Sequence, residues 1–572
     1  MTATHAGPAT ARKPLRLWPG VVAVTLLWLA RFGIKEVVPG FQGFAWSAQG
    51  GLAGAAAVVA WWLLFSRAAW RERVGALVVM IVSLGAAWLV RDASMGLFWL
   101  FAYAVPVLCL AFVMWAVATR GLADGPRSAT MVATIVLACG VWTLLRAEGI
   151  SGDHVASFAW RWTRSPEEKV LAQAGAEPMA VPQVAPATKA GADWPGFRGS
   201  QRDSVVRGVR VATDWSASPP VELWRRPVGP GWSSFAVRGG LLYTQEQRGE
   251  DEIVACYDAT TGRPVWTHRD RARFFEANGG AGPRATPTLA GGHVYTLGAT
   301  GILNALDAAT GAVVWSRNVA SDSKRPVPTW GFSSSPLLAG DLLIAAAGGQ
   351  LLAYDRAKGD PRWSGRAGGG YSSPQLATID GVEQIVMMSG AGAASVAPAD
   401  GRVLWEHAWK GGPIVQPAVT ADGGVLIVAS AVSGTRRLAV AQKASGWTAA
   451  ERWTSLGLKP YFNDFVVHGG HAYGFDARIL ACLDVADGAR KWKGGRYGSG
   501  QLVLLPEQDL LLVLSEEGEV ALVSATPDRF TELTRFKAIE GKTWNHPVIA
   551  GDVLLVRNGE EMAAFRLPLA RR

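Results

Sequence analysis

The side chains best suited to chemistry lie in the second half of the chain, just before short apolar strands. Glu276, Asp464 and Asn463 offer carboxylate and amide oxygens, which ligate divalent cations, and a carboxylate or an imidazole such as His546 can accept a proton. Neighbours in an extended strand point to opposite faces, so Asn463 and Asp464 do not readily ligate one ion. His546 has no carboxylate partner within sequence reach, which favours a hydrogen-bonded rim residue over a base. We therefore predict no metal site and no catalytic residue.

Aromatic and cationic residues occur in the same kind of position. They predict a polar-aromatic binding pocket, although packing around a water-filled axis explains them about as well. The residues that we expect at this candidate ligand site are Trp232, Glu276, Arg284, Trp330, Tyr371, Asn463, Asp464, Trp544 and His546.

An internal repeat positions these residues, because four segments share an Asp, a Gly four residues later and a Trp four residues after that. These segments are CYDATTGRPVW (256–266), ALDAATGAVVW (305–315), AYDRAKGDPRW (353–363) and CLDVADGARKW (482–492). A weaker copy at 396–405 keeps only Gly401 and Trp405, and copies ending near Trp453 and Phe536 keep only the strand pattern.

Each repeat predicts a hairpin between two outer strands. The Asp carboxylate bonds backbone amides two residues on, the Gly takes a positive φ, and the final Trp supplies an apolar surface that docks between neighbouring sheets. Two further strands precede each hairpin. Because the Asp residues recur once per repeat, we interpret them as turn formers rather than catalysts. Cys256 and Cys482 stand in the strand before the turn, and we expect them to be buried small side chains.

The spacing of the repeats predicts a closed ring. Repeats end at 224, 266, 315, 363, 405, 453, 492 and 536, 39 to 49 residues apart, the size of a four-stranded propeller blade. The C-terminus supplies three strands of a blade, and VELWRR near Trp224 supplies the fourth, so pairing the two ends closes the ring. A solenoid of the same repeats is the alternative fold. A solenoid, however, would not require that the strand missing at one end of the domain be present at the other end.

Five apolar runs before residue 147 predict membrane helices. They are Leu17–Ala30, Gly51–Phe65, Val74–Val90, Gly96–Thr119 and Ala129–Leu145. A bilayer core takes about 20 helical residues, so the first run spans only if Arg31 snorkels or the helix continues to Val38. The fold prediction is thus about five transmembrane α-helices in residues 1–150, a polar then Ala/Pro-rich linker in 151–193 and an all-β eight-bladed propeller in 194–572.

Loop charges predict the orientation. With the N-terminus in the cytoplasm, eight basic residues lie on the cytoplasmic side and four on the outer side, as the positive-inside rule requires. This predicts a multi-pass inner-membrane protein with a periplasmic propeller.

The net charge of +10 does not indicate nucleic-acid binding, because residues 1–150 carry 12 basic against 5 acidic side chains and the rest of the chain is nearly balanced. The run from 171 to 193 predicts an extended tether.

The repeat resembles the tryptophan-docking repeat of quinoprotein dehydrogenases, which bind pyrroloquinoline quinone (PQQ), and of the propeller lipoprotein of outer-membrane assembly. The chain most resembles bacterial membrane-anchored PQQ-like propeller proteins, over residues 194–566. Their WPxFRGxxRDG motif corresponds to residues 194–204, with Ser204 where the resemblance implies Gly.

The resemblance implies a PQQ site built from a divalent cation such as Ca²⁺, a carboxylate base and flat groups around the quinone. This chain lacks the vicinal Cys pair of similar alcohol dehydrogenases and a second Asp beside Glu276, and Asp464 replaces the His expected after Asn463. The leading hypothesis is a non-catalytic scaffold without a cofactor that binds an extracytoplasmic protein or a small ligand. The alternatives are a PQQ-dependent dehydrogenase that oxidises an alcohol or sugar and passes electrons to membrane quinone, and a sensor or transporter.

Overall fold

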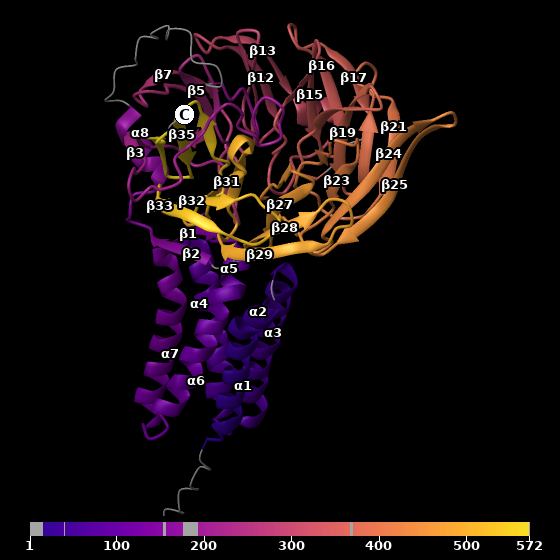
Figure 1. Ribbon diagram of the computed structural model, residues 1–572. Helices are drawn as coiled ribbons and strands as arrows, with labels where there is room; N and C mark the ends of the chain where they lie inside the picture. Colours follow the sequence, from indigo (N-terminus) through magenta and orange to yellow (C-terminus); the bar gives the residue numbers. More distant parts are fainter. Residues whose placement is uncertain (1–14, 39, 153–155, 175–192, 366–369, 571–572) are drawn as a thin grey trace, which may run out of the picture. The chain divides into compact units, whose positions relative to one another are not determined.

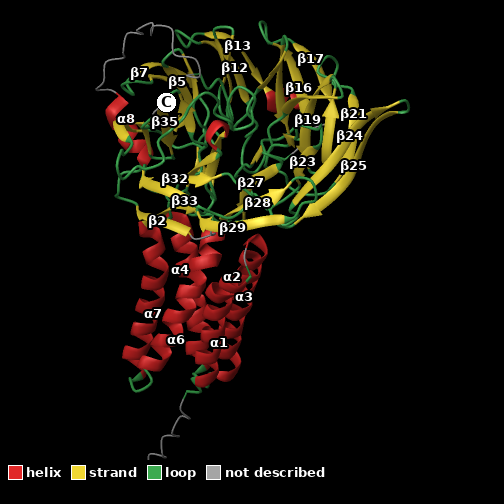
Figure 2. Ribbon diagram, in the orientation of Figure 1, coloured by secondary structure: helices red, strands yellow, loops and turns green. Residues whose placement is uncertain are grey.

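The computed structural model describes residues 15–38, 40–152, 156–174, 193–365 and 370–570, and it divides into two compact units, Met1–Thr163 and Arg164–Arg572. The first unit is mainly helical and the second consists mostly of strands (Figures 1 and 2). Most of the predicted tether, residues 175–192, lies outside the described residues.

Four helical segments of the first unit are long and apolar enough to cross a membrane: Gly43–Phe65, Trp70–Val90, Leu97–Ala118 and Asp124–Leu144. A fifth, Trp18–Gly33, is shorter. These segments confirm the prediction of about five apolar helices. Their elements are α1 (Trp18–Trp28), η1 (Leu29–Gly33), α2 (Ile34–Val37), α3 (Gly40–Ala60), η2 (Trp61–Phe65), α4 (Trp70–Val90), α5 (Leu97–Trp99), η3 (Leu100–Ala104), α6 (Val105–Ala118), α7 (Asp124–Gly140) and η4 (Val141–Leu144).

The first helix continues through the π turn η1 into α2, and the side chain of Arg31 in η1 is buried within the helical unit. This side chain is 2% exposed, and its Nε donates to the Ala102 carbonyl oxygen at 2.8 Å. Ala102 lies in the π turn η3, and π turns interrupt the regular helical hydrogen-bond ladder. The two irregular turns therefore meet through one buried cation.

A hairpin of β1 (Leu145–Ile150) and β2 (Ala156–Trp160) completes the first unit. The Phe158 ring packs on Trp99, Tyr103 and Trp142, with centroids 5.4 to 5.8 Å apart. The start of the predicted linker thus contains a strand, β2, which pairs with β1 through a register shift between Ala147 and Gly149.

The second unit contains eight four-stranded antiparallel sheets within the described residues, which confirms the eight-bladed propeller. We number the blades one to eight in chain order. The strands of blades one to four are β4 (Ala236–Arg238), β5 (Leu241–Arg248), β6 (Asp251–Asp258), β7 (Pro264–Asp270); β10 (Thr288–Ala290), β11 (His293–Leu297), β12 (Ile302–Asp307), β13 (Val313–Asn318); β14 (Leu337–Ala339), β15 (Leu342–Ala347), β16 (Gln350–Asp355), β17 (Pro361–Gly365); and β18 (Gln375–Ile379), β19 (Val382–Ser389), β20 (Gly392–Val396), β21 (Val403–Ala408).

The strands of blades five to eight are β22 (Ala418–Val419), β23 (Val425–Val428), β24 (Thr435–Lys443), β25 (Gly446–Ser455); β26 (Val466–His468), β27 (His471–Asp476), β28 (Ile479–Asp484), β29 (Arg490–Arg496); β30 (Gln501–Leu505), β31 (Leu510–Leu514), β32 (Glu519–Ser524), β33 (Glu532–Lys537); and β34 (Val548–Ala550), β35 (Val553–Arg557), β36 (Glu561–Arg566), β3 (Val221–Pro227). The remaining elements are α8 (Pro166–Ala174), α9 (Val319–Ser323), η5 (Pro506–Gln508), β8 (Phe275–Glu276) and β9 (Gly280–Ala281).

The two ends of the propeller sequence pair to close the ring. Strand β3 pairs antiparallel with β36, and the sheet runs β3–β36–β35–β34. The missing fourth strand of the last blade is therefore supplied from near Trp224, as the repeat count predicted. Closure leaves no blade with an incomplete sheet.

Six of the eight blades are joined to the next by a hydrogen bond from the indole of their repeat Trp. The Trp266 indole Nε1 donates to the Ala308 carbonyl oxygen at 3.0 Å, in the turn of the following blade. Gly311 in that turn has a φ of +75°, and a Cβ there would lie 2.5 Å from the Trp266 ring. Glycine is required for two reasons, the left-handed backbone and the close approach of the ring. Trp224, Trp315, Trp363 and Trp453 make the same contact with Gly262, Gly359, Gly401 and Gly488.

We expect Gly311→Ala to destabilise the propeller by about 1–2 kcal/mol through backbone strain and by a further ~1–3 kcal/mol through overpacking against Trp266. The matched control is Gly292→Ala, which has a φ of +77° but open space around the added methyl group. Thermal unfolding of the full chain in detergent measures both, and equal losses of apparent Tm would show that the ring contact contributes nothing.

Candidate functional site

Residues 194–206, the channel segment, run through the centre of the propeller. Trp194 and Val237 of β4 exchange two backbone hydrogen bonds of 2.8 and 2.7 Å. The Leu289 amide of β10 donates to the Pro195 carbonyl oxygen, and the Val206 amide donates to that of Leu504 in β30. Because innermost strands surround the axis of a propeller, a segment bonded to three of them occupies the central channel.

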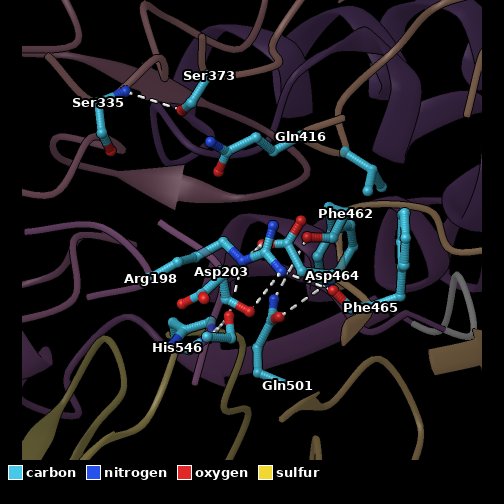
Figure 3. A network of polar contacts seen from close by, with 12 residues as sticks. Arg198, Asp203, Ser335, Ser373, Gln416, Phe462, Asp464, Phe465, Gln501 and His546 are labelled. Carbon is cyan, nitrogen blue, oxygen red and sulfur yellow. Dashed lines mark hydrogen bonds and ion pairs between the residues drawn. The ribbon is translucent and has the colours of Figure 1, made fainter. Parts of the chain in front are cut away.

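Arg198 anchors the channel segment. It is 2% exposed, and it donates from Nη2 to the Phe465 carbonyl oxygen at 2.6 Å and from Nε to the Ser204 hydroxyl at 2.7 Å. Its Nε lies 3.6 Å from Asp464 Oδ2, forming a buried ion pair (Figure 3). Burial raises the pKa of Asp464, and the nearby charge of Arg198 opposes that rise. One side chain thus joins the segment to blade six.

The hydrogen bonds continue from Arg198 through Ser204 to His546. His546 Nδ1 lies 2.8 Å from the Pro547 carbonyl oxygen, so Nδ1 carries the proton and Nε2 accepts from the Ser204 hydroxyl at 2.9 Å. Burial, with the charge of Arg198, lowers the pKa of His546 to about 3, so the ring is neutral. Ser204 is fully buried, so no substrate reaches its hydroxyl, and the serine–histidine pair is structural.

The contacts of Ser204 explain why serine stands where the motif has glycine. Its φ is +60°, a conformation in which glycine is favoured, and Arg198 (+61°) and Arg202 (+54°) share it. The Ser204 hydroxyl accepts from Arg198 and donates to His546, contacts that glycine would lack. Three left-handed non-glycine residues within seven positions store strain that the surrounding contacts must hold.

Asn463 and Asp464 turn to different partners, although both precede strand β26 and Asn463 lies in a bend rather than in the extended strand assumed from the sequence. Asn463 Oδ1 accepts from the Tyr461 amide at 2.9 Å, whereas the Asp464 carboxylate faces Arg198. The Gln501 Oε1 atom accepts from the Asp464 amide at 3.2 Å. The two residues therefore do not form one ligand pair.

Six aromatic residues meet at the end of the channel where the innermost strands begin. Trp330 and Tyr371 lie 4.8 Å apart between ring centroids, and Trp330 reaches Tyr461 at 6.5 Å, joining the loops of blades three and six across the axis. The half-buried rings in this contact chain, here called the aromatic cap, are Trp232, Trp330, Tyr371, Tyr461, Phe462 and Trp544. Lys542 Nζ lies 4.6 Å from the Trp544 ring. The cap therefore closes this mouth with aromatic surface.

Glu276 and Arg284 form a separate ion pair beside the aromatic cap. Arg284 Nη2 lies 3.3 Å from Glu276 Oε1, and the Asn278 amide donates to the same carboxylate at 2.7 Å. Trp232 Nε1 donates to the Gly279 carbonyl oxygen in this loop at 2.7 Å. Burial lowers the pKa of Arg284 to about 10, opposed by the charge of Glu276. The pair holds the loop of β8 and β9 against the cap.

The predicted site residues thus fall into two groups. Trp232, Trp330, Tyr371 and Trp544 meet in the aromatic cap, with Glu276 and Arg284 beside it. Asp464 and His546 instead contact the channel segment, through Arg198 and Ser204, and Asn463 bonds the backbone of Tyr461 in the cap. The sequence analysis did not single out Arg198, Ser204 or Phe462 as site residues. One feature of the sequence could have pointed to these residues, namely Ser204 in place of glycine within the 194–204 motif.

The carboxylates do not suit a cation and a quinone in this arrangement. Glu276 is paired with Arg284 and Asp464 with Arg198, so the negative charge a divalent cation requires is already neutralised. Within the described ranges, no group of three His, Cys, Asp or Glu side chains is placed to hold a metal ion.

A family model described as outer membrane protein assembly factor BamB matches residues 215–370, 250–494 and 389–568. A curated relative of that description from Yersinia pestis is 25% identical over 322 residues, 53% of this chain and 70% of the relative. Solved structures share the fold at low identity. BamB from Moraxella catarrhalis matches at 15% identity, with 62% of this chain and 99% of that chain covered and a TM-score of 0.45. Quinohemoprotein alcohol dehydrogenase ADHIIG from Pseudomonas putida HK5 matches at 12% identity, with 68% of this chain and 84% of that chain covered and a TM-score of 0.50.

The neutral, buried His546 predicts an acid-dependent stability. Its folded pKa of about 3 lies below the ordinary value of 6.5, so the unfolded chain binds more protons between these values. Stability is therefore full above pH 6.5 and falls by about 1.4 kcal/mol per unit as the pH drops towards 3. We expect the unfolding curves of the full chain and of His546→Gln to converge on acidification.

Ser204→Ala is the matched control for this prediction, because it breaks the same hydrogen bond but keeps the buried imidazole. Its stability should keep the acid slope of the unaltered chain. Parallel pH profiles for the unaltered chain and His546→Gln would contradict the assignment.

Proposed function

The chain belongs to the family of outer membrane protein assembly factor BamB, and from this membership we propose that it is a membrane-anchored, non-catalytic scaffold that binds a polypeptide partner. The propeller presents the binding surface, and the apolar helices hold it at a membrane. The aromatic cap is the observation that carries this proposal.

The aromatic cap has the composition of a protein-binding surface. Tryptophan and tyrosine supply large contact areas at a small cost in side-chain entropy and dominate binding energy at protein interfaces. Here five such rings and Phe462 are half-buried at one mouth, braced by hydrogen bonds such as that from Trp544 Nε1 to Glu516 Oε1 at 2.8 Å. A braced surface loses little freedom when a partner binds.

The charged residues support a scaffold rather than a dehydrogenase. A carboxylate base must be free to accept a proton, yet Glu276 and Asp464 are each held by an arginine. Releasing either carboxylate would leave a partly buried guanidinium without its partner, which is costly. The same ion pairs that stabilise the fold therefore oppose quinone chemistry.

We place the helices in the inner membrane, with the N-terminus in the cytoplasm and the propeller in the periplasm. The excess of basic residues on one side of the apolar segments supports this orientation. A polypeptide partner would then meet the aromatic cap outside the cytoplasm.

Site-specific photocrosslinking in cells tests the scaffold. With a photoreactive phenylalanine at Tyr371, the full chain should form a discrete adduct with a partner protein, and Trp330→Ala should weaken that adduct at least tenfold because it removes a central ring. The control site is Val403, on the outer strand β21 of blade four and 39% exposed, which should give no such adduct.

A separate experiment tests the alternative that the protein is a dehydrogenase. The purified full chain should neither bind PQQ at micromolar concentration with Ca²⁺ present nor reduce an artificial electron acceptor with alcohols or sugars. Turnover that depends on PQQ would refute the scaffold proposal.

A further inference from the structure

A cavity of about 350 Å³ lies at the side of the channel segment, away from the aromatic cap. Its walls come from residues within and after the innermost strands of blades four to seven, including Thr378, Val419, His468 and Pro506. The aromatic cap, in contrast, is built from residues that precede innermost strands. Because these strands run in the same direction from the cap, the cavity lies towards the opposite mouth.

The cavity combines an apolar wall with a cationic one. Leu376, Val419, Phe465 and Leu504 contribute apolar surface, and the channel segment and the residues next to it contribute polar groups. The volume falls in the range of small-molecule sites and equals that of roughly twelve water molecules at ~30 Å³ each. A ligand of about ten non-hydrogen atoms fits this space.

Three arginines line the cavity, and two of them are neutralised. Arg198 lies 3.6 Å from Asp464, and Arg207 Nη2 lies 2.7 Å from Asp203 Oδ2. Each of these pairs cancels one positive charge. The net charge at the cavity wall therefore depends on Arg202.

Arg202 has no carboxylate within 4.0 Å among the residues that the structure describes. It is 8% exposed, and its two terminal nitrogens donate to the Pro336 and Ser335 carbonyl oxygens at 3.0 and 3.2 Å. Its Nε is buried without a hydrogen-bond partner in the described structure. Carbonyl oxygens orient a guanidinium but do not cancel its charge.

Arg198 and Arg202 share one nearby carboxylate, Asp464, so the two buried guanidiniums keep one positive charge in excess. Burial and the charge of Arg198 lower the pKa of Arg202 to about 9, and the charge of Asp464 opposes that shift, so Arg202 stays charged at neutral pH. Arg202 also holds a left-handed φ of +54°. An anion in the adjoining cavity would offset the excess charge.

We propose that the cavity binds a small monoanion that carries a carboxylate on an apolar body, with Arg202 as its counter-charge. A single uncompensated charge matches a carboxylate better than a phosphate ester, which carries about −1.5 to −2 at pH 7. The apolar wall accommodates the body of the ligand. This site is separate from the aromatic cap and does not depend on the scaffold proposal.

Calorimetry on the full chain in phosphatidylcholine nanodiscs tests the site, with hexanoate as the probe and empty nanodiscs as the blank. We expect saturable binding with a Kd of about 1 mM or below. Hexan-1-ol, which lacks the charge, should bind at least tenfold more weakly. Hexyl phosphate binding more tightly than hexanoate would overturn the assignment to a carboxylate.

Two variants locate the binding. Arg202→Met should weaken hexanoate at least tenfold, whereas Arg362→Met, at an exposed arginine of β17, should leave it unchanged. Ala418→Phe fills the cavity from blade five while keeping Arg202, and it should abolish binding even if Arg202→Met fails to fold. Absent binding, or binding that Ala418→Phe leaves intact, would overturn the proposal.

Discussion

The propeller depends on how its central channel is filled. Eight blades surround an axis, and the channel segment occupies it with backbone hydrogen bonds to blades one, two and seven and with arginine side chains that reach blades three and six. Arg198 is central, because it holds Asp464, Ser204 and a backbone carbonyl at once. Buried polar groups are stable only when their partners are supplied, so the segment and the innermost strands depend on each other.

Filling the channel divides it into two different ends. One end is closed by the aromatic cap, and the other retains a cavity with an apolar wall and a cationic one. The carboxylates that a quinoprotein-like site would need are used to hold loops and the channel segment. A shared fold therefore need not carry the same site chemistry, in keeping with the rule that function resides in sites rather than in folds.

Much of the fold was predictable because it repeats. A tight turn with Asp and Gly followed by Trp is a local pattern, and Trp266 over Gly311 shows how it also joins neighbouring blades. The eight blades, the closure through Trp224 and the apolar helices all followed from such patterns. The hairpin after Leu145 was missed, since its strands follow no repeat and its packing on Trp99 and Trp142 is long-range.

The sequence by itself determined the architecture, because periodicity, turn chemistry and apolar length act between near neighbours in the chain. It also placed the aromatic residues at one mouth, since all of them precede innermost strands. Only the tertiary structure decided which charges meet. Arg198 and Asp464 are 266 residues apart, and Ser204 and His546 are 342 apart, so nothing local pairs them. The excess positive charge at Arg198 and Arg202, which share Asp464, is likewise visible only once their neighbours in space are known.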